Sequence, residues 1–181
     1  MDSVDRDAPS GSAVRIEPAR ERDVATLLEL IKHLAAYEKL SAEVTATEAQ
    51  LRESLFGNHP AAEVLIAWAG GEAIGFAVFF QSYSTFLGRP GVYLEDLFVL
   101  PDWRHRGYGR KLLAYVARLA VERGCGRLEW SGLDWNEPAI GFYERLGATA
   151  MDQWTVYRLT GDALRRVSEA RSDMCGRSAA P

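Results

Sequence analysis

The sequence predicts a single α/β domain in which helices cover both faces of a mixed β-sheet. Two observations lead to this fold class. Short apolar runs alternate along the chain with segments whose apolar residues recur at helical spacing, which gives the order β-α-α-β-β-β-α-β-α-β. The 181 residues are 48% hydrophobic and 25% charged, which is typical of a soluble protein that buries one core.

The first half of the chain is expected to form two helices between its strands. In the helices the apolar residues recur every three or four positions, and in the strands they are nearly continuous. The Gly70-Gly71 pair is typical of a tight turn between two strands. The expected elements are a strand at 14–16, helices at 19–40 and 47–56, and strands at 63–69 and 73–80.

The second half continues this alternation after a loop at 82–91, which is rich in Ser, Gly and Pro. Strands are expected at 92–100, 127–133 and 153–159, and helices at 109–123 and 137–146. Both ends of the chain are polar and lack any periodicity. We therefore expect a disordered tail at 1–12, a folded domain at 13–165 and a C-terminal tail at 166–181.

Charge and cysteine content restrict the possible partners. The 21 basic and 25 acidic residues leave a net charge of −4, which argues against binding a nucleic-acid backbone. The N-terminus is acidic and polar, whereas a secretory signal begins with basic residues followed by an apolar run. No apolar run in the chain reaches the roughly 20 residues of a membrane span. The spacing of the two cysteines and three histidines predicts neither a disulfide framework nor a metal site. We expect a cytoplasmic protein without a membrane partner.

The segment Arg104–Arg110 lies between an apolar strand and an amphipathic helix. Glycines at 107 and 109 let a ligand approach the backbone, and the free N–H groups of the helix start favour a phosphate or pyrophosphate. A Walker loop needs longer spacing between its glycines, and a dinucleotide loop needs a glycine where Leu112 stands. The alternative interpretation is a helix-capping turn with solvated arginines.

Two adjacent acids, Glu95 and Asp96, interrupt the apolar strand at 92–100. An unpaired buried carboxylate is costly, so each must be paired, neutralised or directed to a binding site. Strand alternation predicts that the two side chains point to opposite faces of the sheet. One could then act as a general base or a cation contact while the other is structural; a structural role for both is the alternative.

The helix expected at 137–146 begins with Asn136, a good N-cap residue, followed by Glu137 and Pro138. Phe142 and Tyr143 point to different sides of this helix. Aromatic residues in such a helix are typical of a core, whereas a catalytic role requires a hydroxyl group that reaches the binding site.

These three segments resemble the GNAT N-acetyltransferases. The family's central motif is Arg/Gln-x-x-Gly-x-Gly/Ala, which here reads Arg104-His-Arg-Gly107-Tyr-Gly109. The closer resemblance is to the spermidine/spermine (diamine) N-acetyltransferases and their thialysine N-acetyltransferase relatives. It covers residues 14–160 in collinear order and is carried by residues 30–38, 93–96, 134–138, 142–143 and 146–148.

The resemblance implies a GNAT-like fold and acetyl transfer from acetyl-CoA to a primary amine, without a metal. It makes Tyr143 the general acid and Glu95 the acceptor-side base, acting through water. The cofactor residues it implies are Leu97, Phe98, Val99, Arg104, His105, Arg106, Gly107, Tyr108, Gly109, Arg110, Asn136, Glu137, Pro138 and Ala139. The acceptor-side residues it implies are Tyr37, Glu38, Glu95, Glu129, Trp130 and Ser131.

The expected acceptor is a small cationic amine, either a polyamine or a thialysine- or lysine-like amino acid, which attacks the acetyl group directly. The run Tyr83-Ser84-Thr85-Phe86 lacks the acid that the polyamine branch carries there and is closer to the thialysine branch. The resemblance also implies a homodimer. The alternatives are a GNAT enzyme that acetylates a protein N-terminus or lysine, and a CoA-binding module without activity. The presence of both Glu95 and Tyr143 argues against the inactive module.

Overall fold

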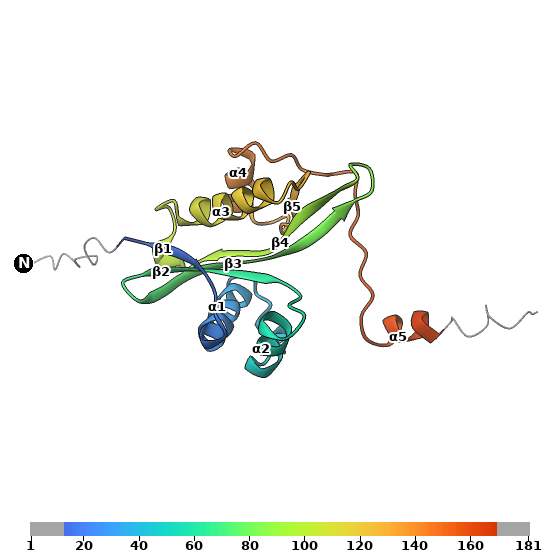
Figure 1. Ribbon diagram of the computed structural model, residues 1–181, viewed down its shortest axis with the longest axis horizontal. Coiled ribbons are helices and arrows are strands. Elements are labelled where there is room, and N and C mark those ends of the chain that lie inside the picture. The colour runs from blue at the N-terminus through green and yellow to red at the C-terminus, as the bar shows by residue number, and fades with distance from the viewer. Residues whose placement is uncertain (1–12, 170–181) are drawn as a thin grey trace, which may run out of the picture. The chain divides into compact units, whose positions relative to one another are not determined.

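A five-stranded mixed sheet forms the centre of the first of two units in the computed structural model, which describes residues 13–169. The first unit ends at Ser131, and the second begins at Gly132. The strands lie in sequence order (Figure 1): β1 (Arg15–Pro18), β2 (Glu63–Ala69), β3 (Glu72–Ser84), β4 (Arg89–Val99) and β5 (Leu128–Trp130). β1 to β4 pair antiparallel, and β5 pairs parallel with β4. The predicted mixed sheet is confirmed.

Helices lie on both faces of this sheet, as the sequence predicts (Figure 1). One face carries α1 (Val24–Tyr37) and α2 (Glu48–Phe56), and the other carries α3 (Tyr108–Glu122). The helix expected at 19–40 is shorter because its first turn is the 3₁₀ segment η1 (Glu21–Asp23). Two further 3₁₀ segments are η2 (Ser41–Glu43) and η3 (Pro101–Trp103).

The core of the first unit anchors β3 and β4 between the helices. Phe76 and Phe98 are buried against Leu27 and Leu30 of α1, and the two phenyl centroids lie 6.2 Å apart. On the opposite face α3 buries Leu112, Leu113 and Val116. Complete burial of each large apolar side chain contributes about 1.5–3 kcal/mol. This packing holds the C-terminal half of β4, which leads into the glycine-containing segment.

A β-bulge interrupts β4 at Glu95. Val78 of β3 lies opposite Asp96, whereas its neighbour Phe79 lies opposite Leu94, so Glu95 is the extra residue. Residues directly opposite each other share one face of the sheet, and Val78 packs against the α1 core. Asp96 therefore lies on the α1 face. The alternation expected from the sequence is broken at this point.

The pairing of β4 with β5 ends at Leu94, directly before the bulge. The two strands pair at Val92, Leu94 and the residue between them, and the described residues provide no further strand on that side of β4. The backbone from residue 95 to residue 99 consequently has one edge without a strand partner. Such an edge offers N–H and C=O groups to an extended ligand.

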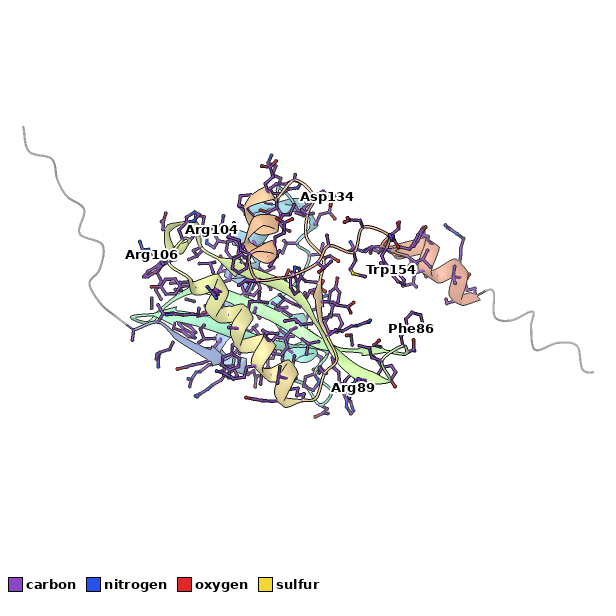
Figure 2. All side chains as sticks on the ribbon, turned by 90° about the horizontal axis from the view of Figure 1, so that it is seen from above. Phe86, Arg89, Arg104, Arg106, Asp134 and Trp154 are labelled. Atoms are coloured by element: carbon purple, nitrogen blue, oxygen red, sulfur yellow. The ribbon has the colours of Figure 1, made fainter. Side chains whose placement is uncertain are left out.

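The prediction of a loop at 82–91 is wrong, because most of these residues belong to the two longest strands, β3 and β4. β3 continues to Ser84 and β4 begins at Arg89, with Ser82 opposite Gly91 in the ladder. Hydrogen bonding to a neighbouring strand outweighs the weak strand preference of Ser, Gly and Pro. Only residues 85–88 form the turn, with Phe86 at its tip (Figure 2).

The second unit contains α4 (Glu137–Glu144) and α5 (Gly161–Glu169). The strand expected at 153–159 is absent from it: these residues belong to no helix or strand, and Trp154 and Tyr157 are exposed. Their alternating pattern finds no partner strand among the described residues of this unit. α5 includes the first residues of the tail expected at 166–181. The rest of that tail, and the tail at 1–12, lie outside the described residues.

Within residues 13–169, every helix falls short of the length and apolarity that a membrane span requires.

Candidate functional site

The segment before α3 has an unusual backbone. Gly107 is the N-cap of α3 and has φ 81°, and His105 has φ 60°, so both lie in the left-handed region. A non-glycine residue in this region is uncommon and is typical of functional segments. A Cβ atom at Gly107 would meet nothing within 4 Å, so its φ angle rather than lack of space favours glycine there.

The first turn of α3 presents backbone N–H groups that have no acceptor within the helix. Lys111 is the first residue to donate back, to the Gly107 carbonyl at 3.0 Å, which leaves the N–H groups of Tyr108, Gly109 and Arg110 available. A Cβ atom at Gly109 would meet only Val99 Cγ2, at 3.9 Å. The helix dipole and these N–H groups together fit a phosphate or pyrophosphate.

Basic side chains surround this helix start. Arg106, Arg110 and Lys111 are exposed, and none forms an ion pair with a carboxylate in the part of the chain that the structure describes. The Arg106 guanidinium lies 5.1 Å from the centre of the Trp103 ring. Because no carboxylate neutralises these cations, they add to the positive field of the helix start.

Arg104 differs from the other basic residues of the segment because its side chain contacts the interior of the unit (Figure 2 labels Arg104 and Arg106). Its Nε donates a hydrogen bond to the Val99 carbonyl at 2.9 Å. Its guanidinium carbon lies 4.1 Å from the centre of the Tyr37 ring and 5.4 Å from that of Phe98. Arg104 therefore contacts α1 and β4.

Three carboxylates gather where the end of α1 faces the bulge of β4. Burial, followed by the charges of Glu95 and Glu38, raises the pKa of the half-buried Asp96 from 3.8 to about 6. Burial also raises the pKa of Glu38, which directly follows the last residue of α1. Glu95, the bulge residue, is exposed.

Uncompensated negative charge distinguishes this cluster. No Lys or Arg among residues 13–169 forms an ion pair with Glu38, Glu95 or Asp96, and these acids do not form a group able to hold a metal ion. An organic ammonium group would relieve their repulsion. Sequence reasoning did not assign Asp96 to the site, since its proximity to Glu38 depends on how β4 pairs with β3 and on which face of the sheet α1 covers.

The acceptor-side residues expected in β5 and just after it are less available. Glu129 forms an ion pair with Arg127, with Oε2 and Nε 2.6 Å apart, so its charge already has a partner. The Ser131 hydroxyl lies 2.7 Å from the Tyr93 hydroxyl, which makes a hydrogen bond between the two. Trp130 is half-buried. Glu38 and Asp96 are thus better placed than Glu129 to meet a cation.

The remaining predicted residues fall into two groups. Leu97, Phe98 and Val99 lie in the part of β4 that has no partner strand on its β5 side. In the second unit α4 begins as predicted after Asn136. The Asn136 carbonyl accepts hydrogen bonds from the backbone N–H groups of Ala139 and Ile140. Tyr143 of this helix is half-buried, and its ring centre lies 5.2 Å from that of Phe142.

Comparison with known proteins places these features in context. The sequence profile of the acetyltransferase (GNAT) family matches residues 25–148. The chain is 39% identical to the thialysine N-epsilon-acetyltransferase of Bos taurus, over 86% of this chain and 97% of that protein. It is 31% identical to L-ornithine N5-acetyltransferase NATA1 of Arabidopsis thaliana, over 92% and 94% of the two chains. The solved structure of aminoglycoside N-acetyltransferase AAC(6')-Iy in complex with CoA is similar with a TM-score of 0.67 and 25% identity, over 84% and 98%.

Replacing Asp96 should change the pH dependence of stability. A raised pKa means that the folded state binds the proton more tightly than the unfolded state, so the stability contributed by this proton is lost as pH rises through about 6. Asp96→Asn should therefore stabilise the protein by about 1–2 kcal/mol more at pH 8 than at pH 5. Urea denaturation at both pH values measures this difference. The exposed Glu72→Gln serves as control, and an equal effect of Asp96→Asn at both pH values would contradict the assignment.

Proposed function

Because the chain belongs to the acetyltransferase (GNAT) family, we propose that it transfers an acetyl group from acetyl-CoA to the primary amine of a small cationic acceptor. One observation carries the proposal. β4 leads from the carboxylates at Glu95 and Asp96 along an edge without a partner strand to the basic, glycine-containing segment that begins at Arg104. An anionic cofactor and a cationic acceptor would thus meet along one strand.

Acetyl-CoA fits the groups that the first unit offers. The free N–H groups at the start of α3 and the cations of Arg106, Arg110 and Lys111 suit its pyrophosphate. The backbone of Leu97–Val99 suits the amide groups of its pantetheine arm. Residues 136–139 of the second unit are proposed as further contacts. When bound, acetyl-CoA supplies a thioester, an acyl group that an amine can attack directly.

Proton transfer by two side chains completes the proposed mechanism. An alkylammonium group has a pKa near ~10 and must lose a proton before it can attack. Glu95 is exposed at the bulge, and its carboxylate accepts this proton directly or through water. The Tyr143 hydroxyl donates a proton to the departing sulfur. The enzyme needs no covalent nucleophile, because both substrates are held together.

Glu38 and Asp96 are proposed to hold a positive charge of the acceptor. The two relatives named above act, by their names, on thialysine and on the N5 amine of ornithine, amino acids with a side-chain amine. The turn after β3 carries no acid, in contrast to the polyamine branch. We therefore propose a lysine-like amino acid as the acceptor in preference to a polyamine.

We also propose that the protein is a cytoplasmic homodimer without nucleic-acid or membrane partners. The second unit exposes apolar side chains that a second copy would cover: Met151, Trp154, Val156, Tyr157, Leu159, Leu164 and Val167. The net charge of −4 supports the proposed absence of a nucleic-acid partner.

The acceptor proposal is tested by a turnover screen with acetyl-CoA that follows release of free thiol. Thialysine, lysine and ornithine should be better substrates than spermidine, and neutral amines should be poor. The Michaelis constant for the preferred amine should rise with salt, since salt screens partly exposed charge pairs. Preference for neutral amines would contradict the role of Glu38 and Asp96. Preference for an intact protein would favour a GNAT enzyme that acts on a protein N-terminus or lysine.

Gly109→Val tests the cofactor site. The added side chain would project from the first turn of α3, where the backbone must approach the phosphate, and its Cβ atom would have only Val99 Cγ2, at 3.9 Å, within 4 Å. Affinity for acetyl-CoA should fall by at least tenfold, or ~1.4 kcal/mol, while the fold survives. Calorimetric titration measures the affinity. Ala114→Val, an exposed change in the same helix, is the control, and unchanged binding by a folded Gly109→Val protein would remove this turn from the site.

Tyr143→Phe tests the general acid. The substitution removes only the hydroxyl and keeps the ring that packs beside Phe142. Loss of general acid catalysis lowers a rate by roughly 10²–10⁴-fold, and a thiolate leaves readily, so we expect a fall near 10² in turnover number. The Michaelis constant of the amine should change little. Tyr157→Phe removes an exposed hydroxyl from the same unit as control. Near-full turnover of Tyr143→Phe, with chemistry rate-limiting, would assign the acid role to another group.

A further inference from the structure

We propose that Arg104 is a positioning residue that couples CoA binding at the start of α3 to the placement of the acceptor carboxylates at the end of α1. This inference rests on the proposed function, because it takes the segment 104–110 as the CoA site. It differs from the assignment of Arg104 as a ligand of the cofactor, and its basis is the set of contacts that the side chain makes.

Arg104 is held at both its backbone and its side chain. Its N–H donates to the Pro101 carbonyl at 3.1 Å, and its Nε donates to the Val99 carbonyl at 2.9 Å. The residue thereby joins the end of β4 to the first position of the segment that precedes α3. Its neighbour His105 has the left-handed φ of 60°, so the chain turns directly after Arg104.

The guanidinium group of Arg104 contacts aromatic rings from α1 and β4. The distances of 4.1 Å to the centre of Tyr37 and 5.4 Å to that of Phe98 are within the range of cation–π interactions. The two ring centres lie 6.5 Å apart. Among residues 13–169, Arg104 forms no ion pair with a carboxylate. The described contacts of this cation are therefore these two rings and the Val99 carbonyl.

Tyr37 connects this contact to the acceptor side. It is the last residue of α1, and Glu38 follows it directly, with its N–H bonded to the Leu34 carbonyl at 2.9 Å. Lys39 then adopts a left-handed φ of 62°, which ends the helix. Glu38 is close enough to raise the pKa of Asp96. A shift of the Tyr37 ring would consequently move a carboxylate that faces the proposed acceptor.

Arg106 provides a matched comparison. It belongs to the same segment and carries the same charge, but it is exposed and lies over Trp103, a residue of the preceding turn. Loss of Arg106 should weaken CoA binding through charge alone. Loss of Arg104 should instead interrupt the path from the segment to α1, because it removes the contact with Tyr37.

Hydrogen–deuterium exchange of residues 34–40, with and without CoA, tests the coupling without any turnover. In the native protein, CoA should slow exchange there by about fivefold or more, the lower end of typical couplings. Arg104→Gln should still bind CoA through the α3 backbone but should lose this protection. Arg106→Gln should keep the protection once CoA is saturating. Tyr37→Leu, which removes the ring at the other side of the contact, should lose it.

Two results would overturn the inference: no CoA-induced protection of residues 34–40 in the native protein, or full protection in folded Arg104→Gln. If Arg104→Gln fails to fold, the same measurement is made on Tyr37→Leu, and full CoA-induced protection of residues 34–40 in that variant would overturn the inference. Kinetics provide a second measurement, in which Arg104→Gln raises the amine's Michaelis constant about fivefold at saturating acetyl-CoA and Arg106→Gln does not. Intact protection without acetyl transfer to any amine would refute the proposed function and leave the coupling standing.

Discussion

The bulge at Glu95 is the structural constraint on which the site depends. It inserts one residue into β4 opposite β3, so that Asp96 shares the α1 face with Phe98 while Leu94 lies on the opposite face, and Glu95 is exposed. β4 and β5 pair only up to Leu94, directly before this bulge. One irregularity in a single strand therefore coincides with both features that the site needs, a backbone edge without a partner strand and a group of convergent carboxylates.

The charges of the first unit are separated along β4 and remain uncompensated at each end. The charges of Glu38 and Glu95 disfavour ionisation of Asp96 near the bulge. After the strand, the free N–H groups of α3 lie beside Arg106 and Arg110, which form no ion pair within residues 13–169. The carboxylate arrangement costs stability, as the raised pKa of Asp96 indicates. Such a cost is expected where substrates of opposite charge complete the electrostatics, and a cationic amine and an anionic cofactor do so in the proposed function.

The contacts of Arg104 differ from what its position in the glycine-containing motif suggests. The glycines of the motif shape a helix start that suits phosphate, whereas the arginine at its first position bonds to Val99 and lies over Tyr37. Its guanidinium suits this place because it is planar, permanently charged and able to donate from Nε while it stacks on a ring. The segment that begins at Arg104 thereby contacts the last residue of α1, directly before Glu38, so one side-chain contact joins the proposed cofactor and acceptor regions.

Features that depend on local pattern could be predicted from the amino-acid sequence alone. Apolar periodicity predicted α1 to α4 and the order of the elements along the chain from β1 to α4, and the Gly107 and Gly109 pair predicted a helix start suited to phosphate. Features that depend on pairing between distant segments could be seen only in the three-dimensional structure. The hairpin at 82–91, the bulge at Glu95 and the absence of a strand at 153–159 all follow from which neighbour supplies hydrogen bonds. The proximity of Asp96 to Glu38 and the contact of Arg104 with Tyr37 depend on the packing of α1, which no spacing along β4 or its following segment encodes.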